Sequence, residues 1–328
     1  MMYNKEFGCN DIKILVNSNN KKVIDDLIDK YDNYYCDNTG NIDYIINYIV
    51  GEPPKGAKKY LDCERGDDSY NYITGNENEL TVYLPEYNSF KEAFAKRIFT
   101  TTFVKIFQEK GYVILHGACA IKNNKGIVIA GNPGAGKTTL LLKLLKNGYS
   151  YVANDRIAIK EQNDDIIVCG VPFSMGIMLE DAKAIIDNPK EKFSYIEEID
   201  KVFIDTKDIS KTFNVDVTNK AILHSIILCH FDLLSSDIKL KRLDNPLKDL
   251  SSSLMLRSAI PRQKSYLHDI IGLPMNSPDF LNDVESWNLI QGQTNTEEIV
   301  EEIDNVVLSK RRNYGKNWYT IWNRGSHC

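Results

Sequence analysis

The stretch GNPGAGKT at residues 131–138 constrains the fold of this chain more than any other feature. It fits the pattern G-x-x-x-x-G-K-[ST] at every fixed position. The preceding GIVIA (126–130) is typical of a buried strand, and the following TTLLLKLLKNG (138–148) is typical of a helix that ends at a glycine. A strand, a glycine-rich turn and a helix in this order predict a phosphate-binding loop in an α/β domain.

Each residue type at a fixed position of this pattern serves phosphate binding in its own way. Glycines let the backbone turn tightly, so that successive N–H groups and the start of the helix point at one anion. A lysine brings a positive charge to the β- and γ-phosphates, and a Ser or Thr hydroxyl is a ligand for Mg²⁺. An ordinary strand–turn–helix connection needs neither the lysine nor three glycines. We therefore expect ATP and Mg²⁺ as cofactors, with nucleotide contacts from Asn132, Pro133, Gly134, Ala135, Gly136, Lys137, Thr138 and Thr139.

Composition narrows the classes of partner. The chain has 328 residues, a formal net charge of −5 and 43% hydrophobic residues, enough to bury a sizeable core. Nucleic acids and anionic membrane surfaces need a basic face, so we expect neither as a partner. The seven cysteines are dispersed without a Cys-x-x-Cys pair, which argues against a zinc site and favours reduced thiols. With no signal peptide or membrane-spanning run in the sequence, we expect a cytoplasmic protein.

Two polar residues near the loop are candidates for chemistry. His116 interrupts the apolar run YVILHGACAIK (112–122), and Asp155 follows the strand-like run SYVAN (150–154). Ligands bind where the strands of an open α/β sheet end, so an Asp there can hold Mg²⁺ or accept a proton from an attacking hydroxyl. The alternatives are a histidine that only satisfies a structural hydrogen bond and an aspartate that only caps a turn.

Apolar periodicity predicts a series of further elements. The run at 89–110 has apolar residues at helical spacing and reads as a core helix. We expect residues 60–78 to be a polar loop. Residues 41–50 fit a strand or a helix, and their β-branched and aromatic content favours a strand. The other expected elements are strands at 11–16, 79–85, 112–122, 126–130, 150–154 and 221–231, a hairpin at 157–172, and helices at 21–31, 137–147, 179–187, 264–274 and 295–311.

The segment LHGACAIKNNKGIVIAGNPGAGKTTLLLKLLKNGYSYVANDRIAI resembles the catalytic domain of the HPr kinase/phosphorylase family. The shared order is a His-Gly strand, a short turn, an apolar strand into the loop, a helix ending in glycine, and a strand ending in an acidic pair. The resemblance covers about residues 111–175. It implies a mixed α/β sheet with flanking helices, similar to that of phosphoenolpyruvate carboxykinases, and transfer of a phosphoryl group to a hydroxyl.

Carried over by position, the resemblance implies roles for individual residues. Lys137 and Thr138 match the phosphate and metal positions, and His116 matches a histidine that hydrogen-bonds to the acidic pair. Asn154 and Asp155 take the place of two aspartates, so this chain departs from the family at the first position. We expect Asp155, His116 and Lys137 to be catalytic, with Thr138 and Asp155 holding the metal. A charged His116 would lower the pKa of Asp155, or His116 would orient it.

The resemblance leaves several functions open. The first is a kinase acting on a Ser or Thr of a peptide or protein, or on a small molecule. The second, motivated by Asn154, is a nucleotide-binding regulatory or accessory protein with little or no kinase activity. The third is an ATPase coupled to a partner complex, which the lack of an apolar strand ending in Asp-Glu disfavours. The family's usual signature after the acidic pair is missing, so we do not expect HPr itself as the substrate.

We expect two regions and a few assisting side chains. Residues 1–88 are predicted to form a small α/β region, and residues 89–328 a kinase-like domain with C-terminal helices; a homo-oligomer is possible on the resemblance alone. The weaker candidates for phosphate, metal or acceptor contacts, each with a plain surface or loop role as the alternative, are Arg156, Ser174, Gly176, Glu180, Arg257 and Arg262.

Overall fold

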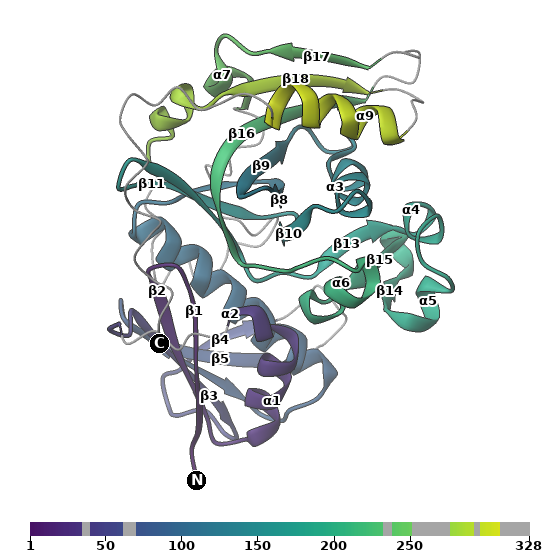
Figure 1. Cartoon of the computed structure of the whole chain (residues 1–328). Coiled ribbons are helices and arrows are strands. Elements are labelled where there is room, and N and C mark those ends of the chain that lie inside the picture. The colour runs from purple at the N-terminus through teal and green to yellow at the C-terminus, as the bar shows by residue number, and fades with distance from the viewer. Residues whose placement is uncertain (35–39, 62–69, 232–237, 251–275, 292–295, 309–328) are drawn as a thin grey trace, which may run out of the picture.

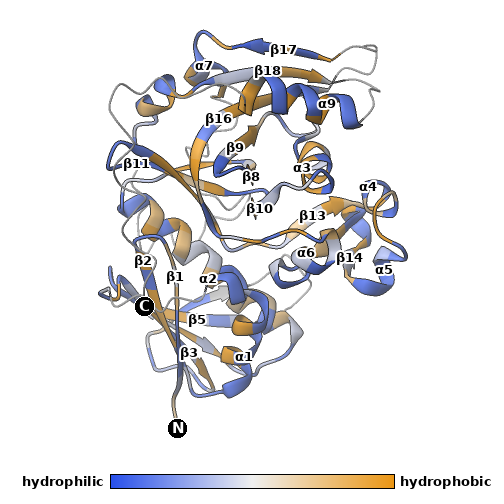
Figure 2. Cartoon of the chain, viewed as in Figure 1, coloured by the Kyte–Doolittle hydropathy of each residue, from blue (hydrophilic) through white to orange (hydrophobic). Residues whose placement is uncertain are grey.

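The computed structural model describes residues 1–34, 40–61, 70–231, 238–250, 276–291 and 296–308, and has a mixed α/β architecture (Figure 1). Three sheets, with helices packed against them, make up this described part of the chain. Apolar residues concentrate on the strands and polar residues on the outer helices and connections (Figure 2). No helix in the same ranges is long and apolar enough to cross a membrane.

The N-terminal sheet has strand order β1-β2-β3-β6-β5-β4. Residues of β3 alternate between buried Tyr44, Ile46 and Tyr48 and partly exposed neighbours, which is the period of two of a sheet with one covered face. The elements of this region are β1 (Tyr3–Cys9), β2 (Ile12–Ser18), α1 (Lys21–Lys30), η1 (Asp32–Tyr34), β3 (Tyr44–Val50), β4 (Lys58–Leu61), β5 (Tyr70–Gly75), β6 (Glu79–Leu84) and α2 (Ser89–Glu109).

Helix α2 is buried on several sides because it lies between two sheets (Figure 1). Its residues Phe99, Phe103 and Phe107 share one apolar core with the N-terminal sheet and with Ala158 and Cys169 of the central sheet. The side chain of Asn88 accepts a hydrogen bond from the backbone N–H of Lys91 and begins the helix. The core helix predicted at 89–110 is therefore confirmed, whereas the domain division after residue 88 stays a prediction.

The central sheet has the order β10-β8-β9-β16-β12-β11-β7, with β18 pairing both β16 and β17. Strand β8 is antiparallel to both β9 and β10, while the long strand β16 runs parallel to β9. Helix α3 packs on β8 and β9. The elements are β7 (Val113–Leu115), β8 (Gly117–Lys122), β9 (Lys125–Ala130), α3 (Lys137–Lys146), β10 (Ser150–Ala153), β11 (Ile157–Gln162), β12 (Asp165–Gly170), β16 (Lys220–Phe231), β17 (Lys239–Arg242), α7 (Pro246–Leu250), η4 (Asp279–Asp283), β18 (Ser286–Gln291), α9 (Thr296–Glu302) and the π-helix η5 (Ile303–Leu308).

A third, small sheet has the order β13-β15-β14 and lies beside α3 and β10 (Figure 1). One of its faces, with Met175, Ile177, Val202 and Ile204, is buried in the same apolar core as α3. The elements here are β13 (Met175–Met178), α4 (Leu179–Lys183), α5 (Pro189–Lys192), β14 (Ser194–Ile196), η3 (Glu197–Ile199), β15 (Lys201–Ile204) and α6 (Thr206–Phe213).

The structure corrects two expectations from the sequence. The predicted strand at 112–122 is two strands, because the chain leaves β7, which pairs with β11, and enters β8, which pairs with β9 and β10. The predicted loop at 60–78 contains β5, whose residues Tyr70–Gly75 form a strand that pairs with β4 and β6. The hairpin at 157–172 is confirmed, with Asn163 and Asp164 at φ of 52° and 67° in its turn. The helix predicted at 264–274 lies outside the described residues.

Candidate functional site

Three segments far apart in the sequence meet at one edge of the central sheet. In the β8–β9 pair, Gly117 lies opposite Ala130, and in the β8–β10 pair, Cys119 lies opposite Ala153. Because β9 and β10 both run antiparallel to β8, their carboxyl ends lie at the edge where β8 begins. The residues that follow these ends, at 131 and 154, therefore lie at the same edge as His116, which precedes β8.

The glycine-rich loop (residues 131–138) has the backbone that its glycines permit. Gly131, Gly134 and Gly136 have φ of 143°, 80° and 86°, in a region that other residues rarely adopt. A Cβ on Gly131 would lie 2.7 Å from the carbonyl oxygen of Cys229 on β16, so the loop also packs tightly against the next strand. A Cβ on Gly134 would meet nothing within 4 Å, so this turn of the loop faces open space.

Lys137 directs its ammonium group into the loop. Its Nζ atom donates hydrogen bonds to the carbonyl oxygens of Gly131 (2.9 Å) and Asn132 (3.0 Å), and the residue is only 9% exposed. Burial lowers the pKa of Lys137, and the carboxylate of Asp155 acts in the opposite direction. The loop therefore holds a positive charge close to the acid that follows β10.

Asn154 and Thr138 connect the two sides of the site. The Thr138 hydroxyl lies 3.4 Å from Oδ1 of Asn154, which is 2% exposed. The Nδ2 atom of Asn154 is buried and has no hydrogen-bond partner among the described residues. A buried amide atom without a hydrogen-bond partner lowers the stability of the fold unless a ligand pairs with it. Rotation of the amide by 180° exchanges the positions of its oxygen and nitrogen. Asn154 can thus offer a donor or an acceptor beside Thr138.

Asp155 is held in an unusual backbone conformation. Its φ is 67°, the left-handed region that aspartate tolerates better than most residues. Nδ1 of His116 lies 2.8 Å from the backbone carbonyl oxygen of Asp155. The family resemblance implied a hydrogen bond from His116 to the acidic pair. The structure has His116 in contact with Asp155, but through the backbone carbonyl oxygen and not through the carboxylate. Burial, assisted by the nearby charge of Lys137, lowers the pKa of His116, which favours a neutral imidazole over the charged one considered above.

The small sheet covers another side of Asp155. One carboxylate oxygen of Asp155 is 3.7 Å from the position that a Cβ on Gly176 would occupy, and the Phe203 ring is 3.1 Å from the same point. The Arg156 guanidinium lies over the Phe173 ring at 4.7 Å. Gly176, one of the weaker candidates named above, therefore lies beside Asp155.

Two of the remaining weak candidates, Ser174 and Glu180, lie among the described residues. The Ser174 hydroxyl donates to Asp205 at 2.8 Å, and Glu180 is exposed, while its neighbour Asp181 accepts a hydrogen bond from Thr139 at 3.1 Å. The Thr139–Asp181 contact joins α3 to α4, and no pattern in the sequence predicts it. Arg257 and Arg262 lie outside the described residues.

The donor set fits a nucleotide phosphate chain with Mg²⁺. The described residues contain no group of three or more His, Cys, Asp or Glu side chains arranged to hold a metal ion. Mg²⁺ bound together with phosphates keeps several waters and needs only one or two protein oxygens, which Thr138 and Asp155 can supply. The unpaired amide atom of Asn154 is a further polar contact at the same place.

Comparison with known proteins gives local similarity. No family model matches the chain. It is 30% identical over 66 residues to the HPr kinase/phosphorylase of Levilactobacillus brevis, and 32% identical over 66 residues to that of Bacillus cereus. These matches cover 20% of this chain, which spans only 21% of the length of either relative.

A solved structure, the Hpr(Ser) kinase/phosphatase from Coxiella burnetii, aligns with 60% of this chain and 88% of that chain. The identity is 16% and the TM-score 0.30, too low to relate the two folds. The sequence similarity to these two HPr kinases/phosphorylases covers one segment of 66 residues.

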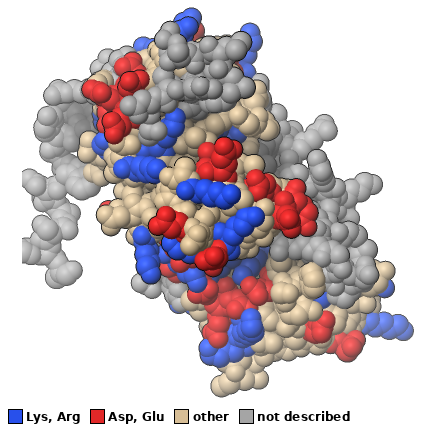
Figure 3. Space-filling model, turned by 90° about the vertical axis from the view of Figure 1, so that its right-hand side faces the viewer, with Lys and Arg blue, Asp and Glu red and all other residues tan. Residues whose placement is uncertain are grey.

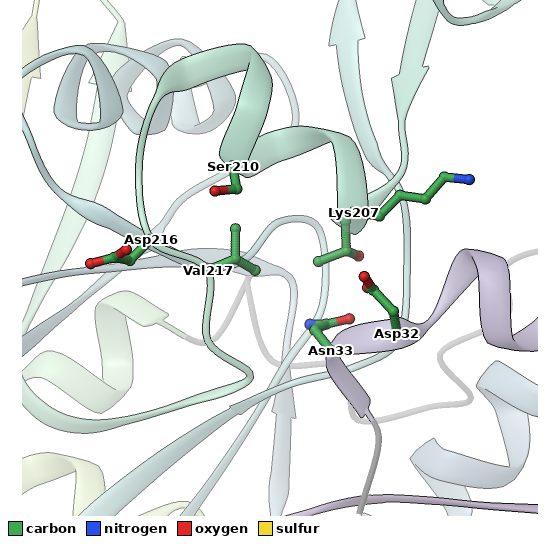
Figure 4. A pocket seen from close by; sticks show the side chains of 7 residues that line it. Asp32, Asn33, Lys207, Ser210, Asp216 and Val217 are labelled. Atoms are coloured by element: carbon green, nitrogen blue, oxygen red, sulfur yellow. The ribbon is translucent and has the colours of Figure 1, made fainter.

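A polar groove of about 460 Å³ lies apart from the glycine-rich loop (Figure 4). It lies between η1 and α6, and both side-chain polar atoms of Asn33 are buried there without a partner among the described residues. None of its lining residues belongs to the loop or to the end of β10. The lining residues are Asp32, Asn33, Thr206, Lys207, Ser210, Asp216 and Val217.

Proposed function

We propose that this chain is an ATP-dependent kinase that transfers a phosphoryl group to a hydroxyl of a peptide, a protein or a small molecule. The observation that carries the proposal is the meeting of the glycine-rich loop and Asp155 at one sheet edge, where the Thr138 hydroxyl lies 3.4 Å from Oδ1 of Asn154, the residue before Asp155. A phosphate cradle alone serves many reactions, whereas a carboxylate beside it can accept a proton from an attacking hydroxyl. The local similarity to HPr kinases/phosphorylases supports the same reaction class.

Each residue has a role in this proposal. Residues 132–139 hold the phosphate chain, and Lys137 exchanges its bonds to loop carbonyls for bonds to phosphate oxygens. Thr138 and Asp155 are the residues that would hold Mg²⁺, which supplies neutralisation of the phosphate charge when it is bound. Most of the rate enhancement in phosphoryl transfer comes from positioning and electrostatics, so the placement of these few groups decides the activity.

The proton is moved by Asp155 in this proposal. The acceptor oxygen attacks the γ-phosphorus, the bond from that phosphorus to the β,γ-bridging oxygen breaks, and ADP leaves with the electron pair. The acceptor proton passes to the carboxylate of Asp155. A neutral His116 donates from Nδ1 to the backbone carbonyl of Asp155 and fixes the peptide in its left-handed conformation. His116 is thus a positioning residue.

The alternative is a nucleotide-binding regulatory or accessory protein with little or no kinase activity. Asn154 favours this alternative, because it has an amide at the first position of the acidic pair, where the similar family has an aspartate. The buried Nδ2 atom of this amide has no hydrogen-bond partner in the described part of the chain. If the first position of the pair carries proton transfer, the chain binds nucleotide without turning it over.

Several wider features belong to the same proposal. We expect a nucleotide and a hydroxyl-bearing acceptor as the partners, and neither nucleic acid nor membrane. The face shown in Figure 3 mixes acidic and basic side chains and is not the uniformly basic face that nucleic acid would need. A cytoplasmic location, a homo-oligomer and a division into regions 1–88 and 89–328 remain predictions.

Three variants test the proposal. Asp155→Asn should retain nucleotide binding and lose about 10²–10⁴-fold in the rate of ADP formation with Mg²⁺ and ATP, measured with and without cell extract as a source of acceptor. Lys137→Ala should lose nucleotide affinity. Asp187→Asn, at an exposed position, should match the wild type. Equal turnover of the Asp155 variant and the wild type rejects the assigned base. Tight binding by a wild type that stays silent in extract supports the regulatory alternative.

A further inference from the structure

One face of the small sheet is directed at the site. Gly176 on β13 and Phe203 on β15 are paired across the strands, and the contacts of Gly176 place Phe203 and the Asp155 carboxylate on the same side of it. Directly opposed residues of antiparallel strands share a face, and so do residues two apart along one strand. The face that carries Phe203 therefore also carries Lys201, two residues earlier on β15.

Lys201 has the properties of a ligand-contacting cation. It is partly exposed, and no hydrogen bond, ion pair or ring contact involves its side chain among the described residues. Burial is the main cause of the lowered pKa of Lys137, and the charge of Lys201 acts weakly in the same direction, in keeping with the place of Lys201 on the face that meets Asp155. The opposite face of the same sheet is apolar and buried against the core that contains α3, which fixes the orientation of β15.

The charges around the loop call for an anion. Lys137, Lys201 and Arg156 are cations, whereas Asp155 and the Asp181 carboxylate, which accepts a hydrogen bond from Thr139, are acids. Burial lowers the pKa of His116, so that it adds no charge at neutral pH. Three positive charges against two negative charges leave a positive surplus that a polyphosphate would neutralise. Two neighbouring lysines repel each other, and a bound anion between them removes the repulsion.

We propose that Lys201 contacts the terminal phosphate of the nucleotide, so that the small sheet senses whether a γ-phosphate is present. The inference rests on the proposed function and adds a nucleotide-contacting residue to it. Lys137 begins α3 in the cradle, and Lys201 approaches from the separate strand β15 on the side of Asp155. Lys201 thus makes ATP bind more tightly than ADP, and it holds the γ-phosphoryl group toward the acceptor.

Fluorescence titrations with ATP and ADP at matched free Mg²⁺ test this inference. Lys201→Gln should weaken ATP binding about tenfold, which equals about 1.4 kcal/mol, and change ADP binding less than twofold. Lys201→Arg keeps the charge and should restore most of the preference for ATP. Lys211→Gln, at an exposed lysine of α6 in the same region, should behave as the wild type.

The outcomes separate the inference from the proposed function. If Lys201→Gln keeps the wild-type ratio of ATP to ADP affinity while Lys137→Ala abolishes binding in the same assay, Lys201 does not contact the terminal phosphate and only the inference fails. Equal weakening of both nucleotides also overturns it, because Lys201 would then act on the cradle or the fold. A wild type that binds neither nucleotide rejects both proposals. Melting temperatures of all variants show whether a loss of binding is a loss of folding.

Discussion

Nδ1 of His116 lies 2.8 Å from the backbone carbonyl oxygen of Asp155, so the imidazole holds the peptide unit that carries the acid and not the carboxylate itself. A carbonyl only accepts, which means that Nδ1 carries the proton and, in the neutral ring, Nε2 does not. The contact joins the junction of β7 and β8 to the end of β10.

The first prediction concerns the kinetic role of His116. His116→Ala should lower the turnover number about 10- to 100-fold and leave the nucleotide Kd within about threefold, since the lost bond positions Asp155 and does not touch the loop. His116→Asn should recover part of the rate, because an amide N–H can replace Nδ1–H. Wild-type kinetics with only a lowered melting temperature would show that His116 is structural.

The second prediction is a pH dependence of stability. The pKa of His116 is lower in the folded chain than its usual value of about 6.5, chiefly because the ring is buried. The unfolded chain therefore takes up the proton first as the pH falls, so the stabilisation from the neutral ring is fully present above about pH 6.5 and is lost below it. Urea unfolding of the wild type and of His116→Asn between pH 5 and 8 measures this contribution as a difference. Parallel curves would contradict the shift.

The third prediction concerns Asn154. Asn154→Asp places a carboxylate at a position that is 2% exposed, beside the Thr138 hydroxyl. Without a cation the buried charge should destabilise the fold by about 1–3 kcal/mol. Mg²⁺ with ATP should reverse this loss, giving a larger rise in melting temperature on ligand addition than the wild type shows. The same rise in both proteins would mean that residue 154 does not face the metal or the phosphates.

The fourth prediction compares two ion pairs that connect α1 to α6. One involves the N-cap residue of α6, Asp205, and the other involves Lys207 on the helix itself. Lys30 binds Asp205 at 2.7 Å with both side chains mostly buried, whereas Lys207 binds Asp29 at 2.5 Å with Asp29 68% exposed. Burial opposes ionisation of Asp205, but Lys30 and the Ser174 hydroxyl outweigh it and lower its pKa.

Lys30→Met should therefore cost about 1–3 kcal/mol in the free energy of unfolding, and Lys207→Met less than about 1 kcal/mol. Denaturant titration at pH 7 measures both. The Lys30 effect should shrink as the pH falls through the lowered pKa of Asp205, because the protonated acid no longer attracts the ammonium. Equal losses from the two variants would show that burial of the Lys30 pair adds nothing.

The sequence was sufficient where local chemistry decides the structure. Glycines at 131, 134 and 136, the apolar run before them and the leucine-rich run after them predicted the loop and α3 at nearly the observed bounds. The β-branched and aromatic content of β3 and the helical spacing in α2 were equally informative.

Tertiary context decided the rest. Residues 113–121 are apolar apart from His116, and one polar residue within a run does not by itself predict that a strand ends. The break at His116 arises because β7 and β8 pair with different strands. The strands of the small sheet have three or four residues each, too few for a periodic pattern. Lys201 and Asp181 acquire their positions from those strands and from α4, and a lysine or aspartate among many others carries no signal of its own.

Asp205 receives hydrogen bonds from Lys30 at the end of α1 and from Ser174, the residue before β13. The first helix of the chain and the strand that contacts Asp155 thus share one acceptor oxygen. A displacement of α1 has to break this junction or pull Ser174 along, and Gly176 lies only two residues further on. The N-terminal sheet is therefore mechanically coupled to the wall of the site, so its loss or rearrangement should alter the geometry around the acid as well as the stability of the chain.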